Sequence, residues 1–139
     1  MFNSLKTLNP LAVLVVSVIG FVIGGLWFSP LLFVKAWMAE VKMTPEAAKA
    51  AGWGKSRMVA AFCLTVVSTF ALAVLVALRG ETSPLKGAEL GLFVGALIVA
   101  SRQGTNALFE LRSRRYYLIV AGYDVTQFTV LGAILAVWR

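Results

Sequence analysis

Four long stretches with few or no charged side chains constrain this chain more than any other feature. An α-helix rises about 1.5 Å per residue, so a stretch of about 20 residues extends across the ~30 Å hydrocarbon core of a bilayer. The first stretch has 19 uncharged residues and the second has 21, while the third and fourth each contain one charge. The four predicted spans are 11–29, 58–78, 90–109 and 116–138. We therefore predict an all-α integral membrane protein, a four-transmembrane-helix bundle with residues 1–139 as a single transmembrane domain.

Composition agrees with a membrane location. Hydrophobic residues make up 60% of the chain and charged residues 14%, whereas a soluble domain has about 25% charged residues. The net charge is +7, and the basic residues lie between the apolar stretches, where they set topology and contact anionic lipid head groups. We expect the lipid bilayer as a partner and no nucleic acid. With no histidine and one cysteine, intrachain disulfides and His-ligated metal or haem sites are excluded, and we expect no cofactor and no metal.

Two segments near the first span have alternative interpretations. The run 11–29 could be a signal peptide, but it is longer than the 7–15 residues of such an apolar region. Ser29 and Pro30 form a helix start signal, and apolar residues at helical spacing after them predict a short interfacial helix. A simple continuation of the first helix into the loop explains the same residues. Further on, Thr44 is a second start signal and Gly52 a stop signal, which predicts one or two turns of helix between them.

The distribution of Lys and Arg predicts the orientation. Positive residues are more frequent in cytoplasmic connections. Eight lie between spans one and two or between spans three and four, and four lie on the other side. The eight are Lys35, Lys42, Lys49, Lys55, Arg57, Arg112, Arg114 and Arg115; the four are Lys6, Arg79, Lys86 and Arg139. This places both termini outside the cytoplasm.

Small residues at helical spacing predict where the helices approach one another. In lipid, helix association depends on close backbone approach and interhelical hydrogen bonds. The predicted packing residues are Gly20, Gly24, Gly87, Gly91, Gly95, Gly104 and Gly132. Packing within one four-helix bundle explains them, and so does a surface for self-association; spacing alone does not separate the two.

One charge in each of the last two spans indicates an intramembrane pair. Counted from a turn near Ser113, Arg102 and Asp124 both lie about 11 residues away, or roughly 16 Å along the axis. An opposite charge at the same depth offsets the cost of burying each one, so we predict that they pair. Gln103, Thr105, Asn106 and Gln127 complete a predicted polar band inside the bundle.

Three roles for this band remain open at the level of sequence. It could be a clasp that fixes the register of two helices. It could be a polar path in which Asp124 accepts a proton or cation and Arg102 gates it or binds an anion. The six consecutive non-hydrophobic residues 101–106 could also break the helix and line a cavity.

Catalysis finds little support in the sequence. No phosphate-binding loop, nucleophile elbow or metal-ligand spacing is present, so we expect no catalytic residues and no enzymatic activity. Cys63 lies within an apolar stretch, where a thiol is usually an inert packing group. The four tryptophans fall at or beyond span ends, as in an aromatic belt: Trp27, Trp37, Trp53 and Trp138.

Two motifs resemble a known family. The run from Trp27 through Ser29, Pro30 and Lys35 to Trp37, and the run Asn106-Ala107-Leu108-Phe109-Glu110 followed by Tyr123, closely resemble the bacterial family called domain of unknown function 1761. The resemblance implies a small four-helix inner-membrane protein and brings no activity with it. It also implies that Asn106, Glu110 and Tyr123 are better candidates than Arg102 and Asp124 for a role that members of the family share. The chain departs from the family in having Val120 where an asparagine is common, and in having Arg102.

Together these observations predict a non-catalytic membrane protein that forms a homo-oligomer or an accessory subunit of a larger membrane complex. The alternative is a small transporter or channel for a proton, an ion or a solute, built on Arg102 and Asp124.

Overall fold

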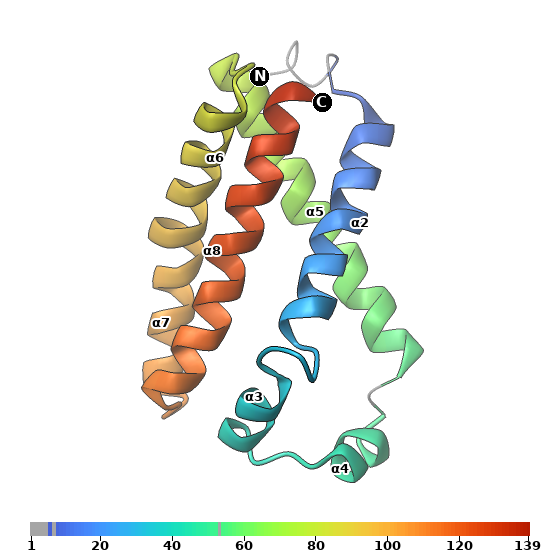
Figure 1. Cartoon of the computed structure of the whole chain (residues 1–139), viewed down its shortest axis with the longest axis vertical. Coiled ribbons are helices and arrows are strands. Elements are labelled where there is room, and N and C mark those ends of the chain that lie inside the picture. The colour runs from blue at the N-terminus through green and yellow to red at the C-terminus, as the bar shows by residue number, and fades with distance from the viewer. Residues whose placement is uncertain (1–5, 7, 53) are drawn as a thin grey trace.

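The structure is a computed structural model that describes residues 6, 8–52 and 54–139, and all regular secondary structure in these ranges is helical. Four helices are long and apolar enough to cross a membrane (Figure 1). They are α2 (Pro10–Trp27), α5 (Lys55–Arg79), the continuous helix Pro84–Phe109, and α8 (Arg114–Val137). The continuous helix consists of α6 (Pro84–Phe93), the π-helical segment η1 (Val94–Val99) and α7 (Ala100–Phe109). Two short helices, α3 (Val34–Glu40) and α4 (Pro45–Ala50), join α2 to α5. The prediction of an all-helical chain with four long apolar helices is confirmed for the described residues.

Local sequence signals set the helix ends. The Asn9 side-chain oxygen accepts hydrogen bonds from the backbone N–H groups of Leu11 and Ala12 at 3.0 and 3.4 Å, ahead of a proline at the first helical position. The Thr44 hydroxyl caps α4 in the same way, 3.1 Å from the Ala47 nitrogen. Gly52, with a φ of +73°, follows the end of α4 as predicted.

Two predicted helix starts differ from the structure. The third long helix begins at Pro84, not at residue 90, because Ser83 and Pro84 are an N-cap and a first helical position. The charged residues that follow are exposed, so they do not prevent the helix from extending there. The helix predicted at Pro30 begins instead at Val34, because the Ser29 hydroxyl accepts a bond from the Leu31 nitrogen in a turn before it.

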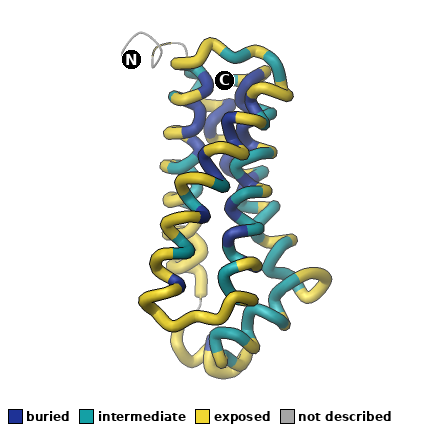
Figure 2. The backbone as a smooth tube through the Cα atoms, turned by 90° about the vertical axis from the view of Figure 1, so that its left-hand side faces the viewer, coloured by how far each residue is buried: buried dark blue, intermediate teal, exposed yellow. Residues whose placement is uncertain are grey.

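Helix α8 lies at the centre of the bundle and contacts α2, α5 and the whole of the third long helix. Buried residues gather in the half of the bundle near the C-terminus and the start of α2 (Figure 2). This core consists of Val13, Val16, Leu72, Ala73, Val76, Leu90, Val94, Leu131, Leu135 and Ala136. The opposite half has few buried residues, and α3 and α4 lie at that end.

Glycines allow α6 and α8 to approach each other closely. A Cβ on Gly87 would clash with the Gly132 carbonyl oxygen, and one on Gly91 would clash with the backbone of Phe128. All seven predicted packing glycines are covered by other helices of the same chain, in each case through a contact that involves α8. Packing within the chain therefore explains them, and they do not form a free self-association surface.

The π-helical segment changes which residues of α7 face α8. Gly87, Gly91 and Gly95 face α8 at intervals of four residues, and continued α-helical spacing would bring Arg102 and Asn106 to that face. A π turn inserts an extra residue. After it, the buried residues are Ala100 and Ala107, so the inward face has moved by about one residue and Arg102 is exposed.

Candidate functional site

A pocket of about 520 Å³ lies between α3, α7 and α8, with Phe28 at its edge. It is in the half of the molecule that the apolar core does not fill. Its lining residues are Phe28, Val34, Trp37, Met38, Gln103, Tyr116, Val120, Tyr123 and Asp124. Residues from α8 recur at i, i+4 and i+7, so one face of that helix forms the back wall.

Asp124 is the buried acid of this pocket, 8% exposed, and its Oδ2 accepts a hydrogen bond from Gln103 Nε2 at 3.2 Å. The predicted pair with Arg102 is wrong. Arg102 is exposed on the outer face of α7, and no ion pair of Asp124 occurs among the described residues. The π turn rotates Arg102 away and brings Gln103 to the inward face.

The predicted polar band divides into an inner and an outer part. Gln127 is buried, and its Nε2 donates to the Gly20 carbonyl oxygen at 3.0 Å, which links α8 to α2. Thr105 and Asn106 are exposed, and the Thr105 hydroxyl donates to the Ser101 carbonyl oxygen at 3.2 Å. The predicted break over residues 101–106 is also wrong, since α7 is continuous there.

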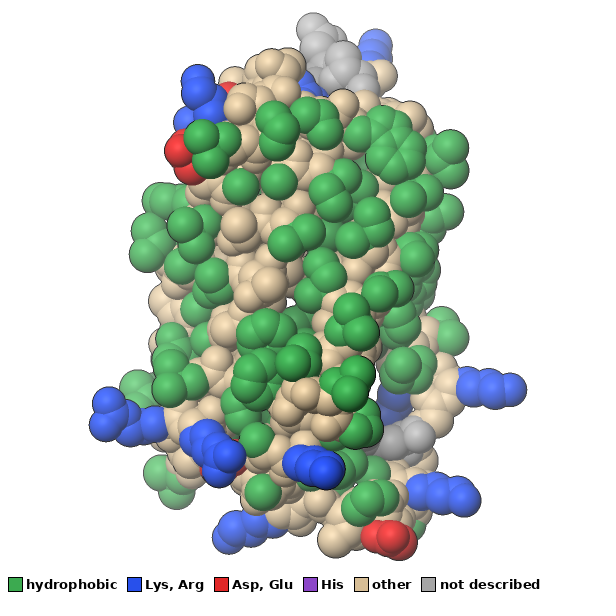
Figure 3. All heavy atoms as spheres, viewed as in Figure 1, with side chains coloured by type: hydrophobic (Ala, Val, Ile, Leu, Met, Phe, Trp, Pro, Cys, Tyr) green, Lys and Arg blue, Asp and Glu red, His purple; other side chains and the backbone are tan. Residues whose placement is uncertain are grey.

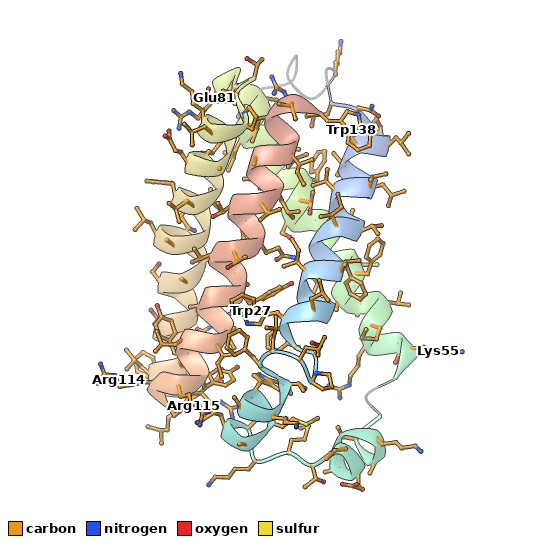
Figure 4. The ribbon with its side chains drawn as sticks, viewed as in Figure 1. Trp27, Lys55, Glu81, Arg114, Arg115 and Trp138 are labelled. Carbon is orange, nitrogen blue, oxygen red and sulfur yellow. The ribbon has the colours of Figure 1, made fainter. Side chains whose placement is uncertain are left out.

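Aromatic rings make up much of the pocket lining. The ring of Phe28 lies 5.4 Å from that of Tyr123 and 5.9 Å from that of Trp37, both in edge-to-face geometry. Behind them, Trp27 points from the end of α2 toward α8 (Figure 4), where its Nε1 donates to the Ile119 carbonyl oxygen at 3.0 Å. The Tyr123 hydroxyl packs over Gly24, so a small residue in α2 makes room for this ring.

A polar tether holds α3 over the pocket. Glu40 at the end of α3 accepts a hydrogen bond from the Ser113 hydroxyl in the turn before α8. It also lies 4.0 Å from the Nε of Arg115. The tether fixes the helix that carries Trp37 and Met38 against the start of α8.

Other residues of interest lie outside the pocket. Pro30 and Lys35 are exposed, and Glu110 forms an exposed ion pair with Arg112 at 3.3 Å. Cys63 was expected to pack inside the bundle. That expectation is wrong, because Cys63 is exposed. Trp53 lies outside the described residues.

Sequence reasoning missed five of the lining residues, namely Phe28, Val34, Met38, Tyr116 and Val120. The spacing of Tyr116, Val120 and Tyr123 with Asp124 on one face of α8 was the available signal. Chemically, the arrangement combines one carboxyl group and one amide with a wall of aromatic rings.

Comparison with known proteins supports the resemblance seen in the motifs. The profile of the family described as a protein of unknown function, DUF1761, matches residues 11–136. Comparisons with curated proteins and with solved structures gave no match. Since the match covers nearly the whole chain, including the four long helices and the pocket, the chain belongs to the DUF1761 family.

Proposed function

We propose that the four long helices cross the bacterial inner membrane with both termini outside the cytoplasm. On the face drawn in Figure 3, apolar side chains cover much of the middle, and Lys and Arg side chains gather toward the two ends. The connections that carry eight of the basic residues lie at the end with α3 and α4, opposite the C-terminus and the start of α2. The positive-inside rule then favours that end as the cytoplasmic one.

We further propose that the protein has no catalytic activity and works in an assembly, as a homo-oligomer or as a subunit of a larger membrane complex. The observation that supports an assembly is the outer face of α7. Four polar residues are exposed there at helical spacing: Ser101, Arg102, Thr105 and Asn106. We call this set the α7 polar face.

The α7 polar face is unfavourable against lipid. Arg102 lies seven residues from the end of α7, which is about 10 Å along the axis. Arginine at the centre of a membrane helix costs about 2.5–3.5 kcal/mol on the insertion scale, and less where it can reach the head groups. A neighbouring protein that supplies hydrogen-bond acceptors to Arg102 and Asn106 lowers this cost.

The test is extraction from native membranes in a mild detergent, followed by native mass measurement of everything that co-migrates. We expect the wild-type chain in an oligomer or larger complex, and the Arg102→Leu, Asn106→Leu double variant as a monomer. Lys86→Leu is the matched control, because Lys86 is an exposed cation near the far end of the same long helix. A monomeric wild type, or a double variant that assembles normally, would contradict the proposal.

A second candidate is passage of a proton, an ion or a solute. The observation that favours it is the pocket with Asp124 at its back, since intramembrane acids mark transport pathways. Because Asp124 does not pair with Arg102, the transport function rests on Asp124 and Gln103. Loss of flux into liposomes for Asp124→Asn, with the wild type active, would support it; a wild type without flux would remove it.

A further inference from the structure

The charges of the lining side chains indicate the charge of a ligand. Asp124 is the only acidic residue among the lining residues, and no Lys or Arg is among them. Arg115, near the start of α8, lies 4.0 Å from Glu40 and is not among the lining residues. An anionic ligand would meet one carboxylate and no cation, so the lining favours a ligand with a positive charge.

The walls indicate that this cation is organic. Phe28, Trp37, Tyr116 and Tyr123 surround the space in front of Asp124. Aromatic faces attract ammonium groups within about 6 Å of the ring centre, and more strongly where water is excluded. A metal cation fits poorly, because Ca²⁺ takes 6–8 oxygen ligands and the pocket offers one carboxylate and one side-chain amide with a few hydroxyl groups.

The size of the pocket agrees with a small molecule. Its volume of about 520 Å³ falls within the ~300–1,000 Å³ typical of ligand sites. This space accommodates an amine or quaternary ammonium group together with an apolar body. The body would lie against Val34, Met38 and Val120, which are apolar.

We propose that the pocket between α3, α7 and α8 binds an organic cation with an apolar body, with Asp124 as the counter-ion and the rings of Trp37 and Tyr123 contacting the positive group. Gln103 holds the carboxylate in place through its 3.2 Å hydrogen bond. The inference deepens the second candidate function, since it names the ligand class of the same pocket, but it requires binding only and no transport.

Benzyltrimethylammonium is a suitable probe, because it carries a fixed charge and an aromatic body. Its binding to the full chain in a non-ionic detergent is measured by equilibrium dialysis against micelles without protein. We expect saturable binding of one probe per chain, and a loss of at least tenfold in affinity for Asp124→Asn. Neopentylbenzene, the uncharged isostere of the probe, is expected to compete at least tenfold more weakly.

Three further variants and a control keep the test decisive. Val120→Phe fills the pocket and leaves Asp124 unchanged, so it should abolish binding even if Asp124→Asn alters the fold. Trp37→Phe keeps a ring and should retain most of the affinity, while Trp37→Leu should lose about tenfold. Arg102→Gln is the matched control, because Arg102 is exposed outside the pocket, and its affinity should equal that of the wild type.

The outcomes separate the ligand class from the functions proposed above. Equal binding of the uncharged isostere, or unchanged affinity in Asp124→Asn, would overturn the cation site. Saturable binding without liposome flux would retain the site and remove transport. Binding by the monomeric Arg102→Leu, Asn106→Leu variant would show that the site does not depend on assembly.

Discussion

Two of the four buried polar residues in the described part of the chain, Ser17 and Gln127, donate hydrogen bonds to backbone carbonyl oxygens of helices. The Ser17 hydroxyl donates to the Val13 carbonyl at 2.7 Å, and Gln127 donates to that of Gly20 at 3.0 Å. A helical carbonyl has a second lone pair, so it accepts such a bond without losing its own helix bond. In an apolar interior this satisfies the side chain without requiring a second polar residue.

Thr69 differs from the other three buried polar residues. Its hydroxyl oxygen is buried and has no hydrogen-bond partner among the described residues. Leaving such a group unsatisfied costs about 1–3 kcal/mol, and valine has nearly the same shape. We expect Thr69→Val to raise the midpoint of thermal unfolding in detergent, measured by the loss of monodisperse protein on heating.

Thr69→Ala is the control for this prediction. It also removes the hydroxyl, but it leaves a cavity, so it should not stabilise the protein to the same extent. A lower unfolding midpoint for Thr69→Val than for the wild type would show that the hydroxyl has a partner.

At the scale of elements, contact between α6 and α8 depends on glycine at two positions on α6. Gly91→Ala would place a methyl group against the backbone of α8, where no side chain can move aside. Overpacking of this kind costs about 1–3 kcal/mol. We expect a clear fall in the thermal unfolding midpoint, measured in detergent.

Gly25→Ala is the matched control, because nothing lies within 4 Å of a Cβ at this helical glycine. It should leave the unfolding midpoint unchanged or raise it, since alanine favours a helix more than glycine does. Equal destabilisation by both substitutions would mean that loss of glycine itself, and not the α6–α8 contact, is responsible.

The π-helical segment gives a second prediction at this scale. Deleting Leu97, which is exposed within η1, removes the extra residue and allows a regular α-helix. Gln103 then stays opposite Asp124, so we expect the deletion variant to fold and to keep its unfolding midpoint within a few degrees. Deleting the exposed Leu75 in α5 should instead unfold the protein, because α5 has no π turn to absorb the rotation. Comparable expression and stability of both deletion variants would contradict this account.

At the scale of the whole molecule, the charged ends determine the orientation in the membrane. Reporter fusions that are active only outside the cytoplasm, placed after Arg139, test this directly. We expect activity at the C-terminus and none at a fusion within α4, because eight basic residues lie in connections on the α4 side. The reverse pattern would invert the topology and place the α3 tether outside the cytoplasm.

The sequence by itself determined the number of long helices, most of their ends and the glycines at the helix contacts. These features depend on short segments: on length, hydropathy, caps and spacing within one helix. The pairing of Asp124 was not accessible in this way. Depth in a hairpin can be counted in residues, but the direction of a side chain depends on every turn before it.

Only the tertiary structure decided which residues face one another. The π turn moves the inward face of α7 by about one residue, so Gln103 meets Asp124 while Arg102 and Asn106 face outward. The ring of Phe28 contacts the rings of Trp37 and Tyr123, although Tyr123 is distant from both residues in the sequence. Such contacts arise from the packing of α3 against α8, and no local pattern encodes the relative rotation of two helices.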